Sequence, residues 1–156
     1  MKKILFDCGF RDATASLGVF ALRVLIGLMM LIGHGIPKIQ HYATLSKEFP
    51  VPDFFPFEHM SRSLSLLACI AGEAGATALI ILGLATRPAA FLLGFTMVVA
   101  AFNIHGAAPW FMGPGVPAAK EPALLYLIPM IAIILSGAGA FSLDALIYRD
   151  SKRRRW

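Results

Sequence analysis

The stretch that decides the fold is Leu17–Ile36, LGVFALRVLIGLMMLIGHGI, which is apolar throughout except for Arg23 and His34. About 20 predominantly apolar residues in a helix cross the hydrocarbon core of a bilayer, which is about 30 Å thick. A charged side chain at the centre of such a helix costs about 2.5–3.5 kcal/mol on insertion scales, and ionisable residues at that depth are functional-site candidates by default. The stretch therefore predicts a transmembrane helix that carries functional polar groups.

The composition agrees with a membrane protein. The chain has 156 residues, of which 58% are hydrophobic and 15% charged, and its mean hydropathy is +0.73. Soluble domains average about 45–50% apolar and about 25% charged residues. Three further apolar runs, Leu64–Ala85, Pro88–His105 and Pro122–Leu143, are long enough or nearly long enough to cross a bilayer. The expected fold class is therefore all-α, a bundle of four transmembrane helices, with a kink in the fourth at Pro129.

The basic residues predict how the bundle is oriented. The segment before the first run, the tight turn Gly83–Arg87 and the segment after the last run hold nine of the fourteen Lys and Arg residues, whereas the two remaining loops hold four. Because cytoplasmic loops are enriched in Lys and Arg, both termini are expected to be cytoplasmic. We expect a cytoplasmic N-terminal segment at 1–16, a membrane domain at 17–147 and a basic tail at 148–156. The tail is interpreted as an anchor beside anionic lipid, not as a nucleic-acid-binding segment.

Polar residues inside and beside the runs are the candidate site. The axial gap between Arg23 and Glu73 is roughly 9 Å at the rise of an α-helix. Arg23 and Glu73 could therefore pair directly or through a water molecule. The pair could be a structural ion pair, or it could be part of a pocket that faces a ligand or a proton path. Further polar side chains gather at the outer end of the bundle or on the inward stripe of the fourth helix: His34, Lys38, His105, Glu121 and Tyr126.

The two histidines admit two interpretations, and the polar residues at the inner end one. His34 and His105 could make interfacial hydrogen bonds or could donate to a quinone carbonyl, and nothing in their spacing favours a metal. Thr86, Arg87 and Asp144 collect at the inner end, where they are expected to form a clasp between the helical hairpin and the fourth helix. Cys8 and Cys69 form no C-x-x-C pair, so neither a disulfide nor a cysteine-based metal site is expected. The sequence also contains no G-x-G-x-x-G, P-loop or H-E-x-x-H motif.

The order and spacing of short blocks along the chain resemble the DoxX family of membrane proteins over residues 17–147. Ala138 stands where the family pattern commonly has proline. The blocks are LRVLIG (22–27), HGIPK (34–38), FPVPD (49–53), GE (72–73) leading to LGLATRPAA (82–90), FNIHG (102–106), KEPALLY (120–126) and SGAGAFSLD (136–144).

The resemblance implies a four-helix protein of the bacterial inner membrane. This broad family includes subunits of thiosulfate:quinone oxidoreductase and partners in membrane-associated oxidoreductase complexes. Thiosulfate activity is not carried over to this chain, because no cysteine lies in either expected outer loop to act as a nucleophile.

The leading hypothesis is a quinone-interacting subunit of a redox system. Glu73, His34 and His105 are the expected catalytic residues, and a histidine with a pKa near neutral suits proton transfer to a quinone. The expected quinone-binding residues are Arg23, Glu73, His34, Lys38, His105, Glu121 and Tyr126. Electrons would come from a soluble or membrane-bound oxidoreductase partner, because the sequence carries no haem, flavin or iron–sulfur signature.

Two alternatives stay open at this point. The first is a non-catalytic scaffold that recruits a soluble oxidoreductase through the basic tail or an outer loop. The second is a small proton-coupled transporter, which would require a homo-oligomer because four short helices leave little room for alternating access.

Overall fold

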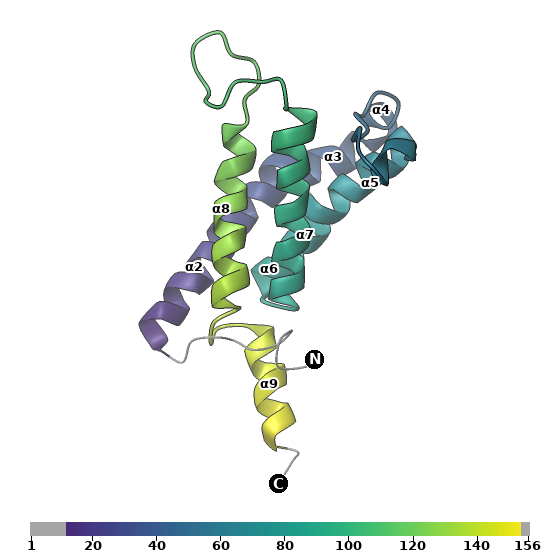
Figure 1. The fold of residues 1–156 in the computed structure, drawn as a ribbon. Helices are drawn as coiled ribbons and strands as arrows, with labels where there is room; N and C mark the ends of the chain where they lie inside the picture. The colour runs from purple at the N-terminus through teal and green to yellow at the C-terminus, as the bar shows by residue number, and fades with distance from the viewer. Residues whose placement is uncertain (1–11, 154–156) are drawn as a thin grey trace.

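The computed structural model describes residues 12–153, and side chains from residue 12 to 148. Within these residues the chain forms helices and no strands (Figure 1). Most of the expected N-terminal segment, 1–11, and the end of the basic tail, 154–156, lie outside the described residues. The elements are α2 (Ala13–Met30), η1 (Leu31–Gly35), α3 (Ile36–Gln40), α4 (Tyr42–Leu45), η2 (Phe57–His59), α5 (Arg62–Ile70), η3 (Ala71–Ala76), α6 (Thr77–Leu82), α7 (Thr86–Val99), η4 (Ala100–Ile104), α8 (Glu121–Ser136) and α9 (Leu143–Arg153).

Several of these elements follow one another without a break and form longer helices. Three continuous helices, Ala13–Gln40, Arg62–Leu82 and Thr86–Ile104, are long and apolar enough to cross a membrane. They agree with the first three expected spans to within a few residues. Asp12 begins the first helix by accepting a hydrogen bond from the amide of Ala15 at 2.7 Å. Ser61 does the same for the second, at the amide of Leu64.

The fourth expected span, Pro122–Leu143, was wrong at its C-terminal end. Helix α8 stops at Ser136, so its 16 residues extend only about 24 Å at the rise of an α-helix. Gly137 follows with a φ of 83° and Gly139 with a φ of 76°, conformations that glycine adopts freely and that end a helix. The chain is then non-helical until α9 begins at Leu143.

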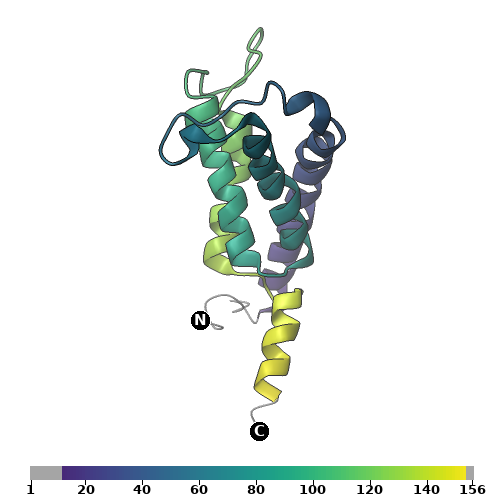
Figure 2. The same cartoon turned by 90° about the vertical axis from the view of Figure 1, so that its right-hand side faces the viewer.

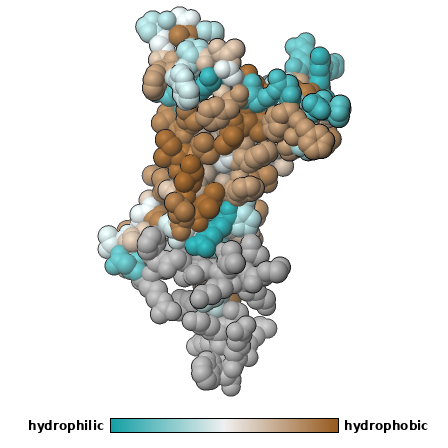
Figure 3. Space-filling view, viewed as in Figure 1, coloured by the Kyte–Doolittle hydropathy of each residue, from teal (hydrophilic) through white to brown (hydrophobic). Residues whose placement is uncertain are grey.

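The helices pack as a bundle whose surface suits a bilayer. Helices α7 and α8 lie side by side, and α2 crosses behind them (Figures 1 and 2). The buried centre contains Met30, Leu93, Met130 and Ile133, each no more than 1% exposed, with alanines between them. On the face drawn in Figure 3, hydrophobic residues cover the middle of the bundle and hydrophilic residues gather toward its ends.

The inner end of the bundle, where α2 begins and α9 leaves, depends on two buried charges. The Arg23 guanidinium donates to the carbonyls of Ile80 at 2.9 Å, Ile81 at 3.4 Å and Phe141 at 2.6 Å. The first two carbonyls belong to the last turn of α6, where the regular donor four residues further on is missing, although the Ile80 carbonyl also accepts from the Gly83 amide. A cation beside a helix C-terminus is also favoured by the helix dipole. Arg23 therefore caps α6 from another helix and holds the segment that follows α8.

Asp144 caps the beginning of α7 in the same manner. Its two carboxylate oxygens accept from the amides of Ala85 at 2.8 Å and Thr86 at 2.9 Å, and its own amide donates to the carbonyl of Gly83. Ala85 makes no side-chain cap of its own. The turn between α6 and α7 is therefore held by a cation on one side and an anion on the other.

Replacement of Arg23 by Met tests this arrangement. The methionine fills similar space but removes the guanidinium donor from three carbonyls, of which that of Ile80 keeps the Gly83 amide. We expect the free energy of unfolding in mixed detergent micelles to fall by about 3 kcal/mol. Arg62→Met is the matched control, because Arg62 donates to a single carbonyl, that of Lys47, on the exposed surface. Equal losses in the two variants would contradict the capping role of Arg23.

Candidate functional site

Three π-helical segments mark the outer half of the bundle. They are η1 in the first long helix, η3 in the second and η4 in the third. His34 lies in η1, Glu73 lies in η3 and His105 directly follows η4. Single π turns inside α-helices are rare and occur frequently at functional sites. Sequence reasoning did not find these segments, although their small residues, as in AGEAGA at 71–76, are a signal of irregular helix packing.

A glycine brings two of these segments into direct contact. A Cβ placed on Gly35 would lie 2.9 Å from the Glu73 carbonyl oxygen and 3.0 Å from the Ala74 Cβ. Only a residue without a side chain permits this approach of two backbones. His34 and Lys38, on the same helix as Gly35, are thereby placed beside Glu73.

The Glu73 carboxylate is the centre of the site. Glu73 is only 6% exposed, and both of its carboxylate oxygens accept hydrogen bonds. Oε2 accepts from Lys38 Nζ at 2.5 Å, and Oε1 accepts from the Cys69 thiol at 3.3 Å. Because an isolated charge is costly in an apolar surrounding, the Lys38 ammonium is what permits an ionised carboxylate here.

The structure does not form the direct pair of Arg23 with Glu73 that the sequence left open. Arg23 is bound to carbonyls at the inner end, and the nearest of them belong to Ile80 and Ile81, seven and eight residues beyond Glu73. That separation is roughly 10 Å along a helix. Arg23 also does not line either of the two cavities described below. The cation that reaches Glu73 is Lys38, which the sequence placed only among the possible ligands of a quinone.

A first cavity of about 290 Å³ lies between the outer halves of the first helix, α7 with η4, and α8. The His34 ring stands edge-on to the Tyr126 ring, with their centroids 5.5 Å apart. The loop between η4 and α8 covers the outer side of this cavity. The lining residues are Met30, His34, Lys38, Glu73, Met97, Ala100, His105, Met112, Pro117, Ala118, Ala119, Pro122, Ala123 and Tyr126.

A second cavity of about 480 Å³ lies between α5 and α7. Most of its lining is apolar, and it shares Lys38, Glu73, Ala100 and His105 with the first cavity. The two cavities therefore meet at the ion pair. The complete lining is Lys38, Phe49, Pro50, Pro52, Phe57, Met60, Ser65, Ala68, Cys69, Glu73, Leu92, Phe95, Thr96, Val99, Ala100, Ile104 and His105.

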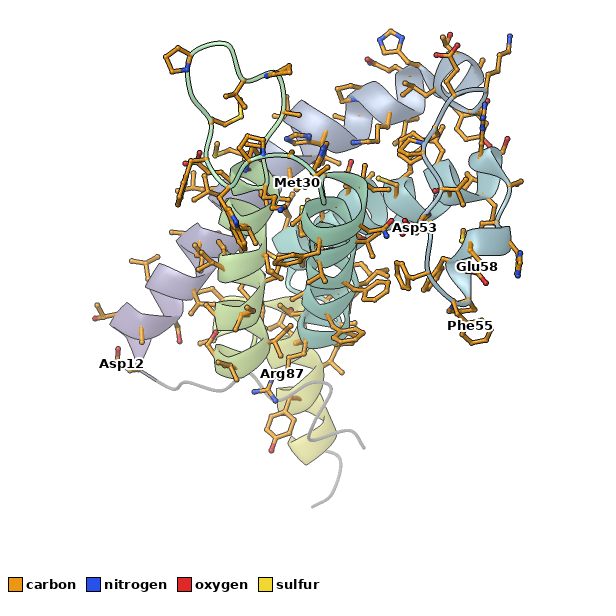
Figure 4. All side chains as sticks on the ribbon, turned by 45° about the horizontal axis from the view of Figure 1, so that its top comes forward. Asp12, Met30, Asp53, Phe55, Glu58 and Arg87 are labelled. Atoms are coloured by element: carbon orange, nitrogen blue, oxygen red, sulfur yellow. The ribbon has the colours of Figure 1, made fainter. Side chains whose placement is uncertain are left out.

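The remaining expected site residues lie elsewhere. Glu121 lines neither cavity, and its Oε2 accepts from the amide of Met112 at 2.8 Å, which holds the covering loop. Asp144 and Thr86 meet at the inner end, through the Thr86 backbone amide. Arg87 lies at that end as well (Figure 4). These residues are structural parts of the fold and are separate from the cavities.

Cys69 is a site residue that sequence reasoning missed. Its spacing to Glu73, four residues along one helix face, was a usable signal, because side chains four residues apart are neighbours on a helix. No group of three or more His, Cys, Asp or Glu residues that could hold a metal ion occurs among the described residues.

Comparison with known proteins gives one family. The sequence model of the DoxX family matches residues 18–106. A relative from Haemophilus influenzae, described as an uncharacterized protein, is 31% identical over 128 residues, which cover 82% of this chain and 89% of the relative. No solved structure gives a significant match.

A double-mutant cycle on Lys38→Met and Glu73→Gln tests the central ion pair. Because each single change leaves the other partner without its ionic contact in a site that is mostly buried, we expect a coupling free energy of about 1–3 kcal/mol from unfolding in detergent micelles. Glu58 and His59 supply the control pair, since they lie 3.3 Å apart on the exposed surface. Such surface pairs contribute little, so their coupling should be close to zero. A coupling free energy for Lys38–Glu73 as small as that of the control pair would show that the ion pair does not stabilise the fold.

Proposed function

The chain belongs to the DoxX family, and we propose that it serves a membrane redox system by binding a quinone where its two cavities meet. The observation that carries this proposal is the ion pair of Lys38 and Glu73 at the junction of a cavity with several polar groups and a mostly apolar one. Binding sites for small molecules are commonly mostly apolar with a few convergent polar groups. A quinone has the matching form, two carbonyl oxygens on a ring and an apolar chain.

The residues at the junction suit the ring of a quinone. The Lys38 ammonium and the imidazoles of His34 and His105 supply N–H donors for carbonyl oxygens. Tyr126 offers an aromatic wall beside His34. Lys38 and His34 come from the first long helix and His105 from the end of the third, so the site exists only in the folded bundle. The donor set therefore fits the ring, although Arg23 and Glu121 take no part in it.

Proton exchange is the task that we assign to the chain's own side chains. A quinone supplies redox chemistry that consumes protons when it is reduced. Glu73 has a cation on one oxygen and a thiol proton on the other, and His105 lies on the wall of both cavities. A carboxylate and an imidazole in one site can accept and donate protons. We propose that a partner oxidoreductase supplies the electrons.

We further propose that the protein lies in the bacterial inner membrane with four crossings and both termini in the cytoplasm. The three long apolar helices supply three crossings, and α8 together with the segment 137–142 supplies the fourth. The side of α9 and the α6–α7 turn then faces the cytoplasm, in agreement with the excess of basic residues there.

Reporter fusions test this orientation. Green fluorescent protein joined after Trp156 should fluoresce and alkaline phosphatase joined there should be inactive, because the former folds in the cytoplasm and the latter in the periplasm. Fusions after Gly115, in the loop at the other end of the bundle, should give the opposite pattern. Active alkaline phosphatase after Trp156 would contradict the proposed orientation.

A second candidate function is a scaffold for a soluble oxidoreductase, and α9 is the observation that favours it. This helix leaves the bundle at the inner end (Figure 1), and its Leu146 and Ile147 are 56% and 45% exposed. Deletion of 152–156 should weaken a scaffold more than a quinone site, provided that the protein still inserts.

Quinone content provides the direct test of the leading proposal. The protein is purified in mild detergent, extracted with organic solvent and assayed for quinone by mass spectrometry. We expect near-stoichiometric quinone in the natural protein and a fall of about tenfold or more in Glu73→Gln. Glutamine no longer holds the Lys38 ammonium by an ionic contact, and loss of one hydrogen bond from a charged donor to the ring accounts for a change of that order. Glu58→Gln is the matched control, because Glu58 lies at the edge of the molecule (Figure 4) and lines neither cavity.

His105→Gln gives a second measurement that leaves the ion pair intact. Its quinone content should also fall, while its unfolding should match that of the natural protein. Background quinone in the natural protein and in every variant would refute the quinone proposal and favour the scaffold.

A further inference from the structure

We infer that the cavity between α5 and α7 holds the isoprenoid chain of the ligand, and that the chain enters it sideways from the bilayer. This inference rests on the proposed function, because it assumes that the ligand is a quinone with a chain. It adds a separate subsite for the chain, on the opposite side of the ion pair from the first cavity.

The polarity of the cavity changes along its length. Its lysine, glutamate and histidine, Lys38, Glu73 and His105, are shared with the first cavity, and Cys69 is hydrogen-bonded to Glu73. The part between α5 and α7 is lined by carbon-rich side chains, among them Phe57, Leu92 and Val99. An amphipathic ligand would therefore place its polar part at the junction and its chain between the helices.

The two hydroxyl groups in the apolar part already have hydrogen-bond partners in the protein and need none from a ligand. Ser65 Oγ donates to the Pro50 carbonyl at 2.7 Å, and Thr96 Oγ1 donates to the Leu92 carbonyl at 3.0 Å. A polar group that is already hydrogen-bonded to protein can border a hydrocarbon chain without the penalty of an unmet hydrogen bond. The whole wall away from the ion pair is thus suited to an apolar chain.

The wall of this cavity is at the same time the outer surface of the bundle. Leu92 is 43% exposed and Phe95 is 38% exposed, and both line the cavity. On α5, Leu64 and Leu67 beside it are 51% and 50% exposed. In a bilayer these side chains contact lipid, so the opening between them leads from the hydrocarbon core into the cavity.

The loop over the outer end of this cavity is tied down, which leaves the side as the entrance. Ser65 holds it at Pro50, and Asp53 forms reciprocal hydrogen bonds with Asn103 of η4. The Phe57 ring packs on the Phe95 ring at a centroid distance of 5.8 Å. Phe55, by contrast, points away from the bundle (Figure 4) and is 80% exposed, where it can rest in the bilayer interface.

Ala68→Phe tests the chain subsite, because Ala68 is an exposed residue of α5 that lines the cavity. Two probes are compared by equilibrium dialysis against the detergent-purified protein. One is a benzoquinone with an isoprenoid chain, and the other has the same ring without the chain. We expect the variant to bind the chain-bearing quinone about tenfold more weakly, the loss expected for about two methylene groups kept out of an apolar site. Its affinity for the chainless quinone should change less than about twofold.

Two controls separate the chain subsite from the quinone site itself. Ala132→Phe makes the same exchange at an exposed position of α8 that lines neither cavity, and should leave both affinities unchanged. Glu73→Gln should weaken both probes alike, because it acts at the ring.

Each outcome has one meaning. Equal effects of Ala68→Phe on the two probes, or no effect on either, would overturn the chain subsite while the quinone proposal stands. Failure of the natural protein to bind either probe would overturn the quinone proposal. In that case, lipids extracted from the purified natural protein and the Ala68→Phe variant are compared by mass spectrometry. Loss of a bound phospholipid from the variant would assign the cavity to an acyl chain instead, and an unchanged lipid content would mean that the cavity holds no chain.

Discussion

The rest of the structure depends on one interaction, the capping of the α6–α7 turn by charges from other helices. Buried charges require partners, and Arg23 obtains them from main-chain carbonyls while Asp144 obtains them from main-chain amides. Both charges thereby satisfy groups that helix ends leave open. Because the residues lie 121 positions apart in sequence, the two caps also tie the first helix to the segment between α8 and α9 and to the beginning of α9. A Cβ on Gly83 would lie 2.4 Å from the Arg23 guanidinium, so this turn has no spare room.

The outer half of the bundle is built on a different principle. There the long helices leave the regular α pattern, approach one another through small residues, and place ionisable side chains on the walls of cavities. Irregular helix and cavities both reduce packing contacts, which protein interiors otherwise maximise. Local strain and imperfect packing of this kind are common at functional sites, where the surrounding structure maintains them. The regular inner end supplies that support.

Sequence patterns predicted the helices well and the site only in part. Apolar run length located the first three helices because a bilayer-crossing helix needs a known number of residues. The C-terminal end of the fourth helix was placed too late because Gly137 and Gly139 lie in a segment whose composition is still apolar. Hydropathy carries no information about the positive φ angles that end the helix. The sequence compared Arg23 and Glu73 only by their depth along the helix axes. Their partners in the structure depend also on the direction in which each side chain leaves its helix. The π segments change that direction, and no periodicity in a single sequence shows them. The cavities were beyond prediction because their walls come from loops and helices far apart in the chain.

The π segment between Glu73 and the carbonyls that bind Arg23 has a consequence for how the protein can vary in evolution. A π turn accommodates an additional residue within a helix, and its removal would rotate everything beyond it by about 100°. Deletion of one residue from 71–76 would therefore swing Ile80 and Ile81 out of reach of Arg23 even if Glu73 kept its place. Single-residue insertions and deletions in this stretch should be eliminated by selection while many side-chain exchanges around it are tolerated. We therefore expect the length of segment 71–76 to be conserved in evolution more strictly than its overall composition.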